Sequence, residues 1–484
     1  MRQNGEGAEK MTIVYDKGMV LQAAQNQPTA IVIFGGTGNL AQTKLLPALF
    51  NLYNEKRLPD EFVIVGLSRK EFSHEDYQKF VNDSVKTKEP ESDEATLMNF
   101  CSHVRFAAGN FDDSASYNRI KDELLIFDAY VGQCTSKLFY LAVPPSLYAD
   151  IFTQLKESQV MSLCDGLGSW SRLLVEKPFG NDLETAAALE RQLCETFNED
   201  QIYRIDHYLA KDSIENILSL RFANSILADS WDGTHIESID LRLFESQDVS
   251  TRGSFYDGIG ALRDVGQNHM LQMLALLTMD STDMNSSAAI RSSRLAAIKA
   301  LVIHETDIHE RAQYQGYLET PGVSPLSDTE TYFKIGTHSD SELWKDVHIS
   351  LESGKAMGAS LAEAVITFKP IDDCSCAAKP ERHFHRNVLR IGFSPKQTIT
   401  LTMWVKEPGF VFRLHERDLL LASQEGEVFR SPEAYERVLY DCIIGDQTRF
   451  VSGEEVAAAW NFITPILTSF KNTPLHKYEK GSNP

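Results

Sequence analysis

Two kinds of hydrophobic spacing divide this chain of 484 residues. In the first part, short continuous apolar runs rich in β-branched residues alternate with longer stretches of helical periodicity. Such runs are typical of strands that are buried on both faces of a parallel sheet. They occupy Thr29–Phe34, Phe62–Leu67, Lys137–Val143 and Arg172–Val175. The alternation of strand and helix signals from residue 29 to about residue 203 predicts a doubly wound α/β domain.

The second part of the chain alternates apolar and polar residues, which is typical of antiparallel strands with one exposed face. The predicted strands are Ile236–Phe244, Val347–Leu351, Ala364–Phe368, Val388–Phe393 and Thr398–Trp404. Helical spacing predicts covering helices at Asp264–Leu277, Pro432–Ile444 and Gly453–Phe470. Two polar segments, 285–293 and 320–331, are predicted as surface loops. We expect a flexible tail over residues 1–28, an α/β domain over 29–203, and a β+α domain with a large, mainly antiparallel sheet over 204–484.

Composition and charge restrict the possible partners. A hydrophobic content of 43% with 24% charged residues is ordinary for a soluble globular protein. No run approaches the roughly 18 apolar residues of a membrane span, and the first residues lack the apolar segment of a secretory signal. The net charge of -21 argues against binding to nucleic acid or to an anionic membrane. The seven cysteines are scattered without a disulfide framework, so we expect a cytoplasmic protein.

A glycine-rich turn, Gly35-Gly36-Thr37-Gly38, follows the first predicted strand and opens a helical segment, 40–53. Glycines in this position allow the backbone to approach a pyrophosphate, and the helix N-terminus offers free N–H donors. The complete G-x-G-x-x-G pattern is absent, and a plain tight turn is the alternative. Arg69 ends the second strand, where an NAD enzyme usually places an acid. A basic residue there favours NADP, although an exposed surface arginine has the same appearance in a sequence.

The run Arg204–Lys211 places an acid, an imidazole, a phenol and an ammonium together, in Asp206, His207, Tyr208 and Lys211. Such a cluster is able to bind an anion and to orient a base, while a solvated surface segment is the alternative.

His269 is a candidate base because its side chain titrates near neutral pH, with Asp206 as its candidate partner. A satisfied core histidine is the alternative for this residue. Lys177 follows a buried strand at the sheet edge where α/β proteins bind ligands, and the alternative is a surface lysine in a turn.

A separate group of residues raises a zinc hypothesis. Cys374 and Cys376 are followed by His383 and His385, and residues two apart in a strand share one face. Two such pairs across a hairpin would supply four zinc ligands. The spacing does not match the common zinc motifs, and a loose charged loop fits equally well.

Taken in order, the motifs resemble those of the glucose-6-phosphate dehydrogenase family from about residue 30 to about residue 470. The most specific are RIDHYLAK (204–211) and RDVGQNH (263–269), while FGGTGNLAQTKLLPAL (34–49), IVGLSRK (64–70), LLVEKPFG (173–180) and SGKAM (353–357) also match. The resemblance implies a Rossmann-type dinucleotide-binding domain followed by a β+α domain whose large sheet mediates dimerisation. A homodimer or a homotetramer is therefore expected.

The resemblance also implies a reaction and residue roles. NADP would oxidise glucose 6-phosphate at C1 to a lactone, the first step of the oxidative pentose phosphate pathway. His269 would be the base and Asp206 its partner, while His207, Tyr208 and Lys211 would hold the phosphate. The other substrate positions are Lys177, Glu245, Asp264 and Lys355. The cofactor positions are Gly35, Gly38, Leu40, Lys44, Arg69 and, again, Lys177.

Several residues depart from the family pattern. Ala210 replaces a glycine, which would strain a backbone with positive φ but not a helical one. Asn39 replaces an aspartate, Ser360 a basic residue, Ser394 a glutamine and Glu352 an arginine. Two competing functions stay open. One is another NAD(P)-dependent sugar or sugar-phosphate dehydrogenase, which would not need the phosphate cluster, and the other is a non-catalytic NADP-binding sensor.

Overall fold

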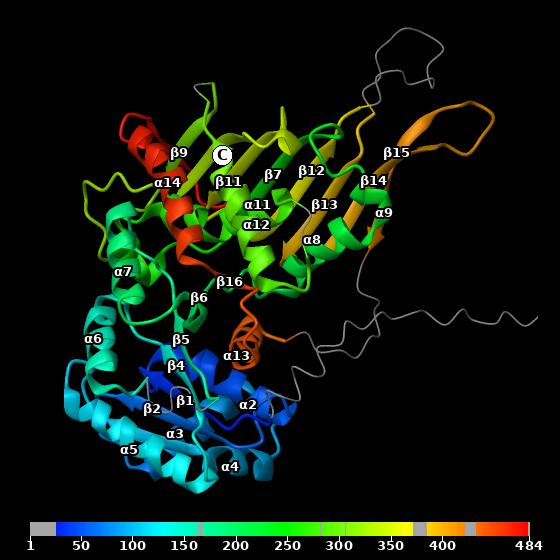
Figure 1. Ribbon diagram of the computed structural model, residues 1–484. Helices are drawn as coiled ribbons and strands as arrows, with labels where there is room; N and C mark the ends of the chain where they lie inside the picture. The colour runs from blue at the N-terminus through cyan, green and yellow to red at the C-terminus, as the bar shows by residue number, and fades with distance from the viewer. Residues whose placement is uncertain are drawn as a thin grey trace, which may run out of the picture.

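The computed structural model describes residues 26–161, 163, 168–280, 283–304, 306–370, 385–421 and 432–482. They form two lobes, each built on one sheet (Figure 1). The first sheet has the strand order β16-β6-β5-β4-β1-β2-β3. Its strands are β1 (Thr29–Phe34), β2 (Phe62–Ser68), β3 (Val104–Ala108), β4 (Ser136–Leu141), β5 (Ser171–Val175), β6 (Ile202–Ile205) and β16 (Phe450–Val451). The predicted α/β domain is therefore confirmed, and its strands are parallel apart from β16.

Alternate residues of β1 enter two different cores. Ile31 and Ile33 pack with one set of helices, while Ala30, Val32 and Phe34 pack with another. This explains why the strand is apolar at every position rather than at every second one. The helices are η1 (Ala41–Leu45), α2 (Leu46–Asn54), α3 (His74–Lys88), α4 (Glu94–Ser102), α5 (Ser114–Val131), α6 (Tyr148–Ser158) and α7 (Leu183–Cys194). Pro47 lies in the first turn of α2, directly after the π-helical η1, where a missing N–H is tolerated.

The second sheet has the order β15-β14-β13-β12-β7-β11-β10-β9-β17, and β8 pairs with β10. Its strands are β7 (Ile236–Phe244), β8 (Leu301–Val302), β9 (His309–Tyr314), β10 (Tyr332–Ser339), β11 (His348–Gly354), β12 (Leu361–Phe368), β13 (Val388–Ser394), β14 (Thr398–Lys406), β15 (Leu414–Leu421) and β17 (Leu475–Tyr478). Most neighbours are antiparallel, and the pairs β7–β11 and β9–β17 are parallel. The large, mainly antiparallel sheet is confirmed.

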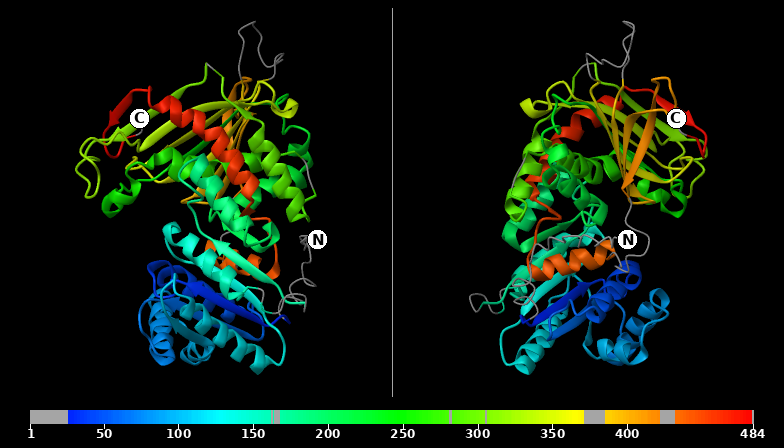
Figure 2. Two further views of the ribbon diagram at one scale, coloured as in Figure 1. Left: turned by 60° about the vertical axis from the view of Figure 1, so that its left-hand side comes forward. Right: turned by 90° about the vertical axis from the view of Figure 1, so that its right-hand side faces the viewer.

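Helices cover one face of the second sheet (Figure 2). They are α8 (Asp212–Ala223), the π-helical η5 (Leu262–Met270) continued by α11 (Leu271–Thr278), α12 (Ser287–Lys299) and α14 (Gly453–Phe470), with short helices α9 (Ser225–Ala228) and α10 (Gly253–Tyr256) nearby. The loop predicted over 285–293 was wrong, because α12 begins there. The Ser286 side chain accepts a hydrogen bond from the Ala289 N–H, so the polar residues form a helix N-cap.

One helix was predicted correctly but placed on the wrong sheet. Helix α13 (Ala434–Ile444) packs against α2 of the first lobe, not against the second sheet. Its buried residues Val438, Leu439 and Cys442 belong to the same core as Ile31. Strand β16 follows and pairs with β6, so late residues complete the first lobe. The periodicity of a helix identifies its apolar face but not the surface that this face contacts.

Cysteine chemistry differs in one respect from the expectation. Cys101, Cys194 and Cys442 are free thiols, whereas Cys134 is disulfide-bonded, which the scattered cysteine spacing did not predict. Within the described ranges, no helix is both long enough and apolar enough to span a bilayer.

Candidate active site

The candidate base lies where the two lobes meet. His269 is near the end of η5, and Asp206 directly follows β6. The two residues are each 2% exposed, and His269 Nδ1 lies 2.5 Å from Asp206 Oδ1. The Tyr208 N–H donates to the same carboxylate oxygen at 2.9 Å, which fixes its orientation. The structure therefore brings together two residues that the sequence separates by 63 positions.

The contacts of His269 determine its tautomer. The Lys177 ammonium lies 2.9 Å from His269 Nε2, and an ammonium is a donor only, so Nε2 accepts. The proton of a neutral ring then resides on Nδ1 and is donated to Asp206. Burial lowers the pKa of His269, and Lys177 lowers it further, while Asp206 opposes both. Burial by itself disfavours ionised Asp206, but the facing His269, with His207 and Lys177, brings the pKa of this carboxyl below its usual value.

The phosphate residues implied by the family resemblance surround this pair. The rings of His207 and Tyr208 lie 4.5 and 4.4 Å from the His269 ring, and Lys211 Nζ lies 3.8 Å from the Tyr208 ring centre. Burial lowers the pKa of Lys211. Burial and His269 lower the pKa of His207 to about 3, so this ring is neutral near pH 7 and acts as a hydrogen-bonding group. Ala210 is buried and is not among the described residues with positive φ, so its methyl group does not strain the backbone.

A second polar cluster is held by β7, η5 and the turn after β11. Lys355 forms an ion pair with Glu245 and lies 3.1 Å from Asp264 Oδ2, while Lys177 Nζ lies 3.8 Å from Asp264 Oδ1. Burial opposes the charge on Lys355, but Asp264 and Glu245 raise its pKa overall. Asp264 thus links the two lysines, and through Lys177 it connects this cluster to His269.

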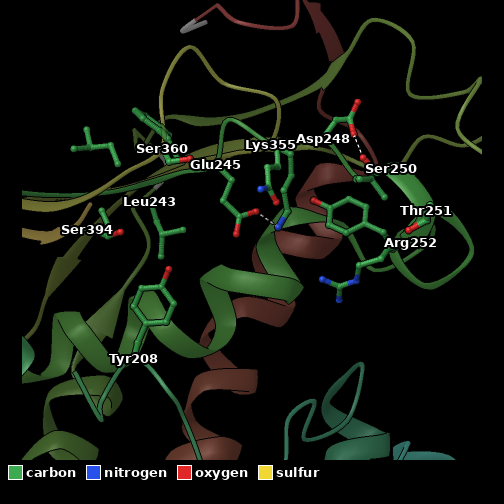
Figure 3. Close-up of a pocket in the computed structure, with 16 residues that line it drawn as sticks. Tyr208, Leu243, Glu245, Asp248, Ser250, Thr251, Arg252, Lys355, Ser360 and Ser394 are labelled. Carbon is green, nitrogen blue, oxygen red and sulfur yellow. Dashed lines mark hydrogen bonds and ion pairs between the residues drawn. The ribbon is translucent and has the colours of Figure 1, made fainter. Parts of the chain in front are cut away.

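This cluster faces a cavity of about 530 Å³ (Figure 3). Tyr208 points toward it from below the Glu245–Lys355 pair, and Ser360 and Ser394 lie on the same side as Tyr208. The Ser360 hydroxyl contacts the Ser246 hydroxyl at 2.9 Å. Two of the departures from the family pattern therefore place neutral hydroxyl groups on the cavity wall.

Glu352 lies elsewhere. It accepts a hydrogen bond from the Tyr332 hydroxyl at 2.8 Å, and Arg242 lies 3.8 Å away. It is not among the residues that line the cavity.

Several residues that line the cavity have no role predicted from the sequence. Arg252 is the most notable, because it brings a guanidinium to the side opposite Ser360 (Figure 3). Burial opposes the charge on Asp264, but Lys177 and Lys355, and after them Arg252, bring the pKa of this carboxyl below its usual value. The segment RGSFYDG starts at this arginine and lies shortly before the RDVGQNH motif. This proximity to a motif was the available signal.

The predicted cofactor residues gather at the carboxyl ends of β1 and β2, the edge where α/β sheets bind ligands. Gly35 has φ +83°, and a Cβ there would lie 2.5 Å from the Ala142 carbonyl oxygen, so this turn excludes a side chain. Thr37 donates to Ser68 at 3.0 Å, which joins the turn to the end of β2. Arg69 follows and is exposed. These residues fit a dinucleotide, with backbone donors for its pyrophosphate and a cation near its ribose.

Two further cofactor positions lie on the helix after the turn. Leu40 is half-buried beside the apolar core, and Lys44, in the π-helical η1, lies 3.3 Å from Glu433 at the start of α13. Asn39 is exposed at the same turn. Both predicted functional helices thus contain a π-helical segment, a local geometry that is frequent at functional sites.

The zinc hypothesis falls mostly outside the described residues, where Cys374, Cys376 and His383 lie. His385 is described, and its ring lies 4.3 Å from that of Trp404. In the described part of the chain, no group of three or more potential ligands is arranged to hold a metal ion.

Comparisons with known proteins agree with the predicted family. The model of the glucose-6-phosphate dehydrogenase NAD binding domain matches residues 32–216, and that of the C-terminal domain matches residues 218–484. The glucose-6-phosphate 1-dehydrogenase of Bacillus subtilis (strain 168) is 34% identical over 478 residues, which cover 96% of each chain. That of Aggregatibacter actinomycetemcomitans is 36% identical over 474 residues, covering 93% of each.

Solved structures give the same result. A glucose-6-phosphate dehydrogenase in complex with its substrate glucose-6-phosphate has a TM-score of 0.87 at 32% identity and covers 95% of this chain and 96% of its own. The glucose-6-phosphate 1-dehydrogenase of Mycobacterium avium has a TM-score of 0.80 at 30% identity, with 94% and 95% covered. This chain is therefore an oxidoreductase that belongs to the glucose-6-phosphate dehydrogenase family.

Proposed function

We propose that this protein oxidises glucose 6-phosphate at C1 with NADP, and that His269 is the general base. The observation that carries this proposal is the state of the His269 ring. Its Nδ1 is 2.5 Å from Asp206, and its Nε2 lone pair accepts from the Lys177 ammonium at 2.9 Å. A neutral imidazole with one nitrogen anchored and the other accepting is the arrangement that general base catalysis requires.

In the proposed reaction, His269 Nε2 accepts the proton of the C1 hydroxyl. The C1–O bond becomes the carbonyl of a 6-phospho-lactone as the C1–H electron pair departs. A nicotinamide cofactor, held at the turn that carries Gly35, would supply the acceptor for this hydride. Asp206 holds the ring and stabilises the imidazolium as it forms, because a nearby negative charge favours the protonated ring.

We propose that His207, Tyr208 and Lys211 hold the phosphate, and that Lys177, Glu245, Asp264 and Lys355 hold the sugar. Their mutual contacts support this division, and Tyr208, Glu245 and Lys355 line one cavity. A phosphate carries about -1.5 to -2 charges and accepts several strong hydrogen bonds, so it suits an ammonium beside a phenol and a neutral imidazole. The acidic pair Glu245 and Asp264 suits neutral sugar hydroxyls, which donate to carboxylates.

We further propose that NADP is the preferred cofactor. The exposed Arg69, directly after β2, supports this, since a guanidinium donates charge-assisted hydrogen bonds to a 2′-phosphate such as that of NADP. Gly35, Gly38 and Leu40 would frame the pyrophosphate turn. Lys44, beside Glu433, would lie near the cofactor and the sugar.

A homodimer or a homotetramer is also proposed. The exposed apolar side chains of β14 and β15 support self-association, among them Val405, Leu419, Leu420 and Leu421. Sedimentation of the protein and of Leu420→Glu tests this, since a monomeric wild type would contradict it. A cytoplasmic location is also proposed. The free thiols of Cys101, Cys194 and Cys442 support it, the disulfide bond of Cys134 does not, and cell fractionation tests it.

The decisive experiment is a grid of initial rates for glucose 6-phosphate and free glucose with NADP and NAD. We expect the highest kcat/KM for glucose 6-phosphate with NADP. Equal efficiency with free glucose would refute the phosphate assignment, and equal efficiency with NAD would refute the cofactor preference. Absence of turnover with every pair would instead support the non-catalytic alternative.

A further inference from the structure

The C-terminal strand reaches the back of the candidate active site. Strand β17 adds to the second sheet beside β9, and its last residue, Tyr478, is 5% exposed within a cluster of tyrosines. The Tyr478 hydroxyl donates to the Lys355 carbonyl at 2.6 Å. Tyr478 therefore contacts the backbone of Lys355, which lies 123 positions earlier in the sequence and whose side chain faces the cavity.

A directed series of hydrogen bonds holds this contact. The Tyr314 N–H donates to Thr331 Oγ1 at 2.9 Å, and Thr331 Oγ1 lies 2.9 Å from the Tyr478 hydroxyl. Because the single proton of Tyr478 is directed to Lys355, with a longer contact of 3.2 Å to the Thr331 carbonyl, Thr331 is the donor to Tyr478. Both hydroxyl groups thus have fixed directions, and each is buried.

The turn that carries Lys355 needs support. The next residue, Ala356, has φ +53°, a conformation that costs a residue with a side chain some free energy. Backbone hydrogen bonds hold the turn from both sides: Lys355 N–H to the Thr331 carbonyl at 2.9 Å, and Gly481 N–H to the Ala356 carbonyl at 2.8 Å. The second of these also comes from the C-terminal segment. The surrounding hydrogen bonds therefore stabilise a backbone conformation that is intrinsically unfavourable for Ala356.

We propose that Tyr478 is a positioning residue for Lys355: its hydroxyl fixes the Lys355 carbonyl, so that the ammonium is directed toward Glu245 and Asp264 where the sugar binds. This proposal rests on the proposed role of Lys355 in substrate binding. Tyr478 itself does not line the cavity and contacts neither His269 nor Asp206 among the described contacts. Its loss should weaken binding of the sugar phosphate more than it slows the chemical step.

The test is Tyr478→Phe, which removes the hydroxyl and keeps the ring in its cluster. We expect KM for glucose 6-phosphate to rise about five- to tenfold, the effect of one lost buried hydrogen bond, with kcat changed less than about twofold. Tyr317→Phe is the matched control. Tyr317 belongs to the same cluster and is fully buried, but its hydroxyl donates to Asp257 at 3.2 Å and not to the Lys355 turn.

A double-mutant cycle with Lys355→Met separates positioning from general structural damage. If Tyr478 acts through Lys355, adding Tyr478→Phe to Lys355→Met should raise KM no further. Additive effects, an unchanged KM in Tyr478→Phe, or an equal rise in Tyr317→Phe would each overturn the proposal. If Lys355→Met alone leaves KM unchanged, the substrate-binding role of Lys355 fails and the Tyr478 proposal fails with it. If only Tyr478→Phe is silent, the role of Lys355 stands.

Discussion

Replacing Asp206 by Asn removes the buried negative charge that faces His269 and keeps nearly the same size and shape of side chain. The amide oxygen of Asn is able to take the place of Oδ1, which accepts from Tyr208 N–H and from His269 Nδ1. The other carboxylate oxygen, Oδ2, has no hydrogen-bond partner among the described residues, so the new NH₂ group displaces no existing contact. Asp206→Asn therefore tests the charge of this residue more than its shape.

The size of the effect follows from the short separation of the two groups. Two unit charges about 4 Å apart interact by about 4 kcal/mol at an effective dielectric constant of about 20, an upper bound of about three pKa units. In the transition state the proton is only partly transferred to His269, so about half of this interaction energy stabilises the transition state. Its loss corresponds to about 30-fold in rate. An amide oxygen accepts a weaker hydrogen bond from Nδ1 than a carboxylate does, so the tautomer is held less firmly, and we expect kcat to fall about 30- to 1000-fold.

The pH profile gives an independent readout. Burial lowers the pKa of His269 and Asp206 raises it, so removing the carboxylate lowers this pKa further. The acidic limb of kcat/KM, where His269 becomes protonated and inactive, should shift to lower pH while the plateau falls. The phosphate of the substrate titrates near pH 6 in both proteins, so the difference between the two profiles reports the enzyme.

A matched control is Asp232→Asn. Asp232 is paired with His235 at 2.9 Å on the surface, away from the cavity, and its replacement should leave both kcat and the acidic limb unchanged. The reasoning is refuted if Asp206→Asn lowers kcat but leaves the acidic limb at the pH of the wild type. That result would mean that Asp206 acts on the fold of the site and not on the charge of His269.

Four other substitutions test the remaining assignments. His269→Asn should lower kcat about 10²- to 10⁴-fold with a modest change in KM, and a dominant KM effect in steady-state assays would contradict its role as base. Lys211→Ala should raise KM for glucose 6-phosphate about tenfold or more and leave free glucose unaffected; an equal effect on both sugars argues against a phosphate contact. Arg69→Ala should raise KM for NADP about tenfold or more without changing that for NAD, as measured with each cofactor varied. Ala210→Gly should lower the free energy of unfolding in urea by about 1 kcal/mol, because its backbone has no positive φ to relieve; a stabilised variant would contradict this.

Much of the fold was predictable because each sheet imposes its own spacing on the sequence. The strand Thr29–Phe34 was predicted at its exact bounds, since residues buried on both faces leave no polar position to confuse the pattern. The strands His309–Tyr314 and Leu475–Tyr478 were missed. Both lie near the end of the second sheet, where polar side chains such as Arg311 and Lys477 interrupt the alternation. The spacing of apolar residues in a sequence reflects which side chains are buried. At such a sheet edge, apolar and polar side chains do not alternate regularly, so the spacing does not identify the strand.

The site was predictable by residue type but not by contact. His269 and Asp206 were paired through the family resemblance, and no spacing in the sequence places them 2.5 Å apart. Arg252 was missed because its only signal was proximity to a motif. The support that Tyr478 gives to Lys355 had no signal at all, since a tyrosine near a chain end carries no local pattern. Long-range contacts of this kind become visible only when the sheet order is known.

The contact between Lys177 and His269 implies that a substrate hydroxyl must displace the Lys177 ammonium before it can reach the imidazole. In the structure, the Lys177 ammonium donates to Nε2, the atom that accepts the substrate proton in the proposed mechanism. Lys177 also donates to the Asp264 carbonyl at 3.1 Å and lies near its carboxylate, so it keeps partners when it leaves the ring. A substrate hydroxyl that replaces the ammonium at Nε2 then faces a neutral base whose pKa burial and Lys177 have lowered. Moving the ammonium away removes one of these influences and makes the ring more basic as the hydroxyl arrives. In the proposed mechanism, Lys177 therefore couples substrate binding to activation of the base.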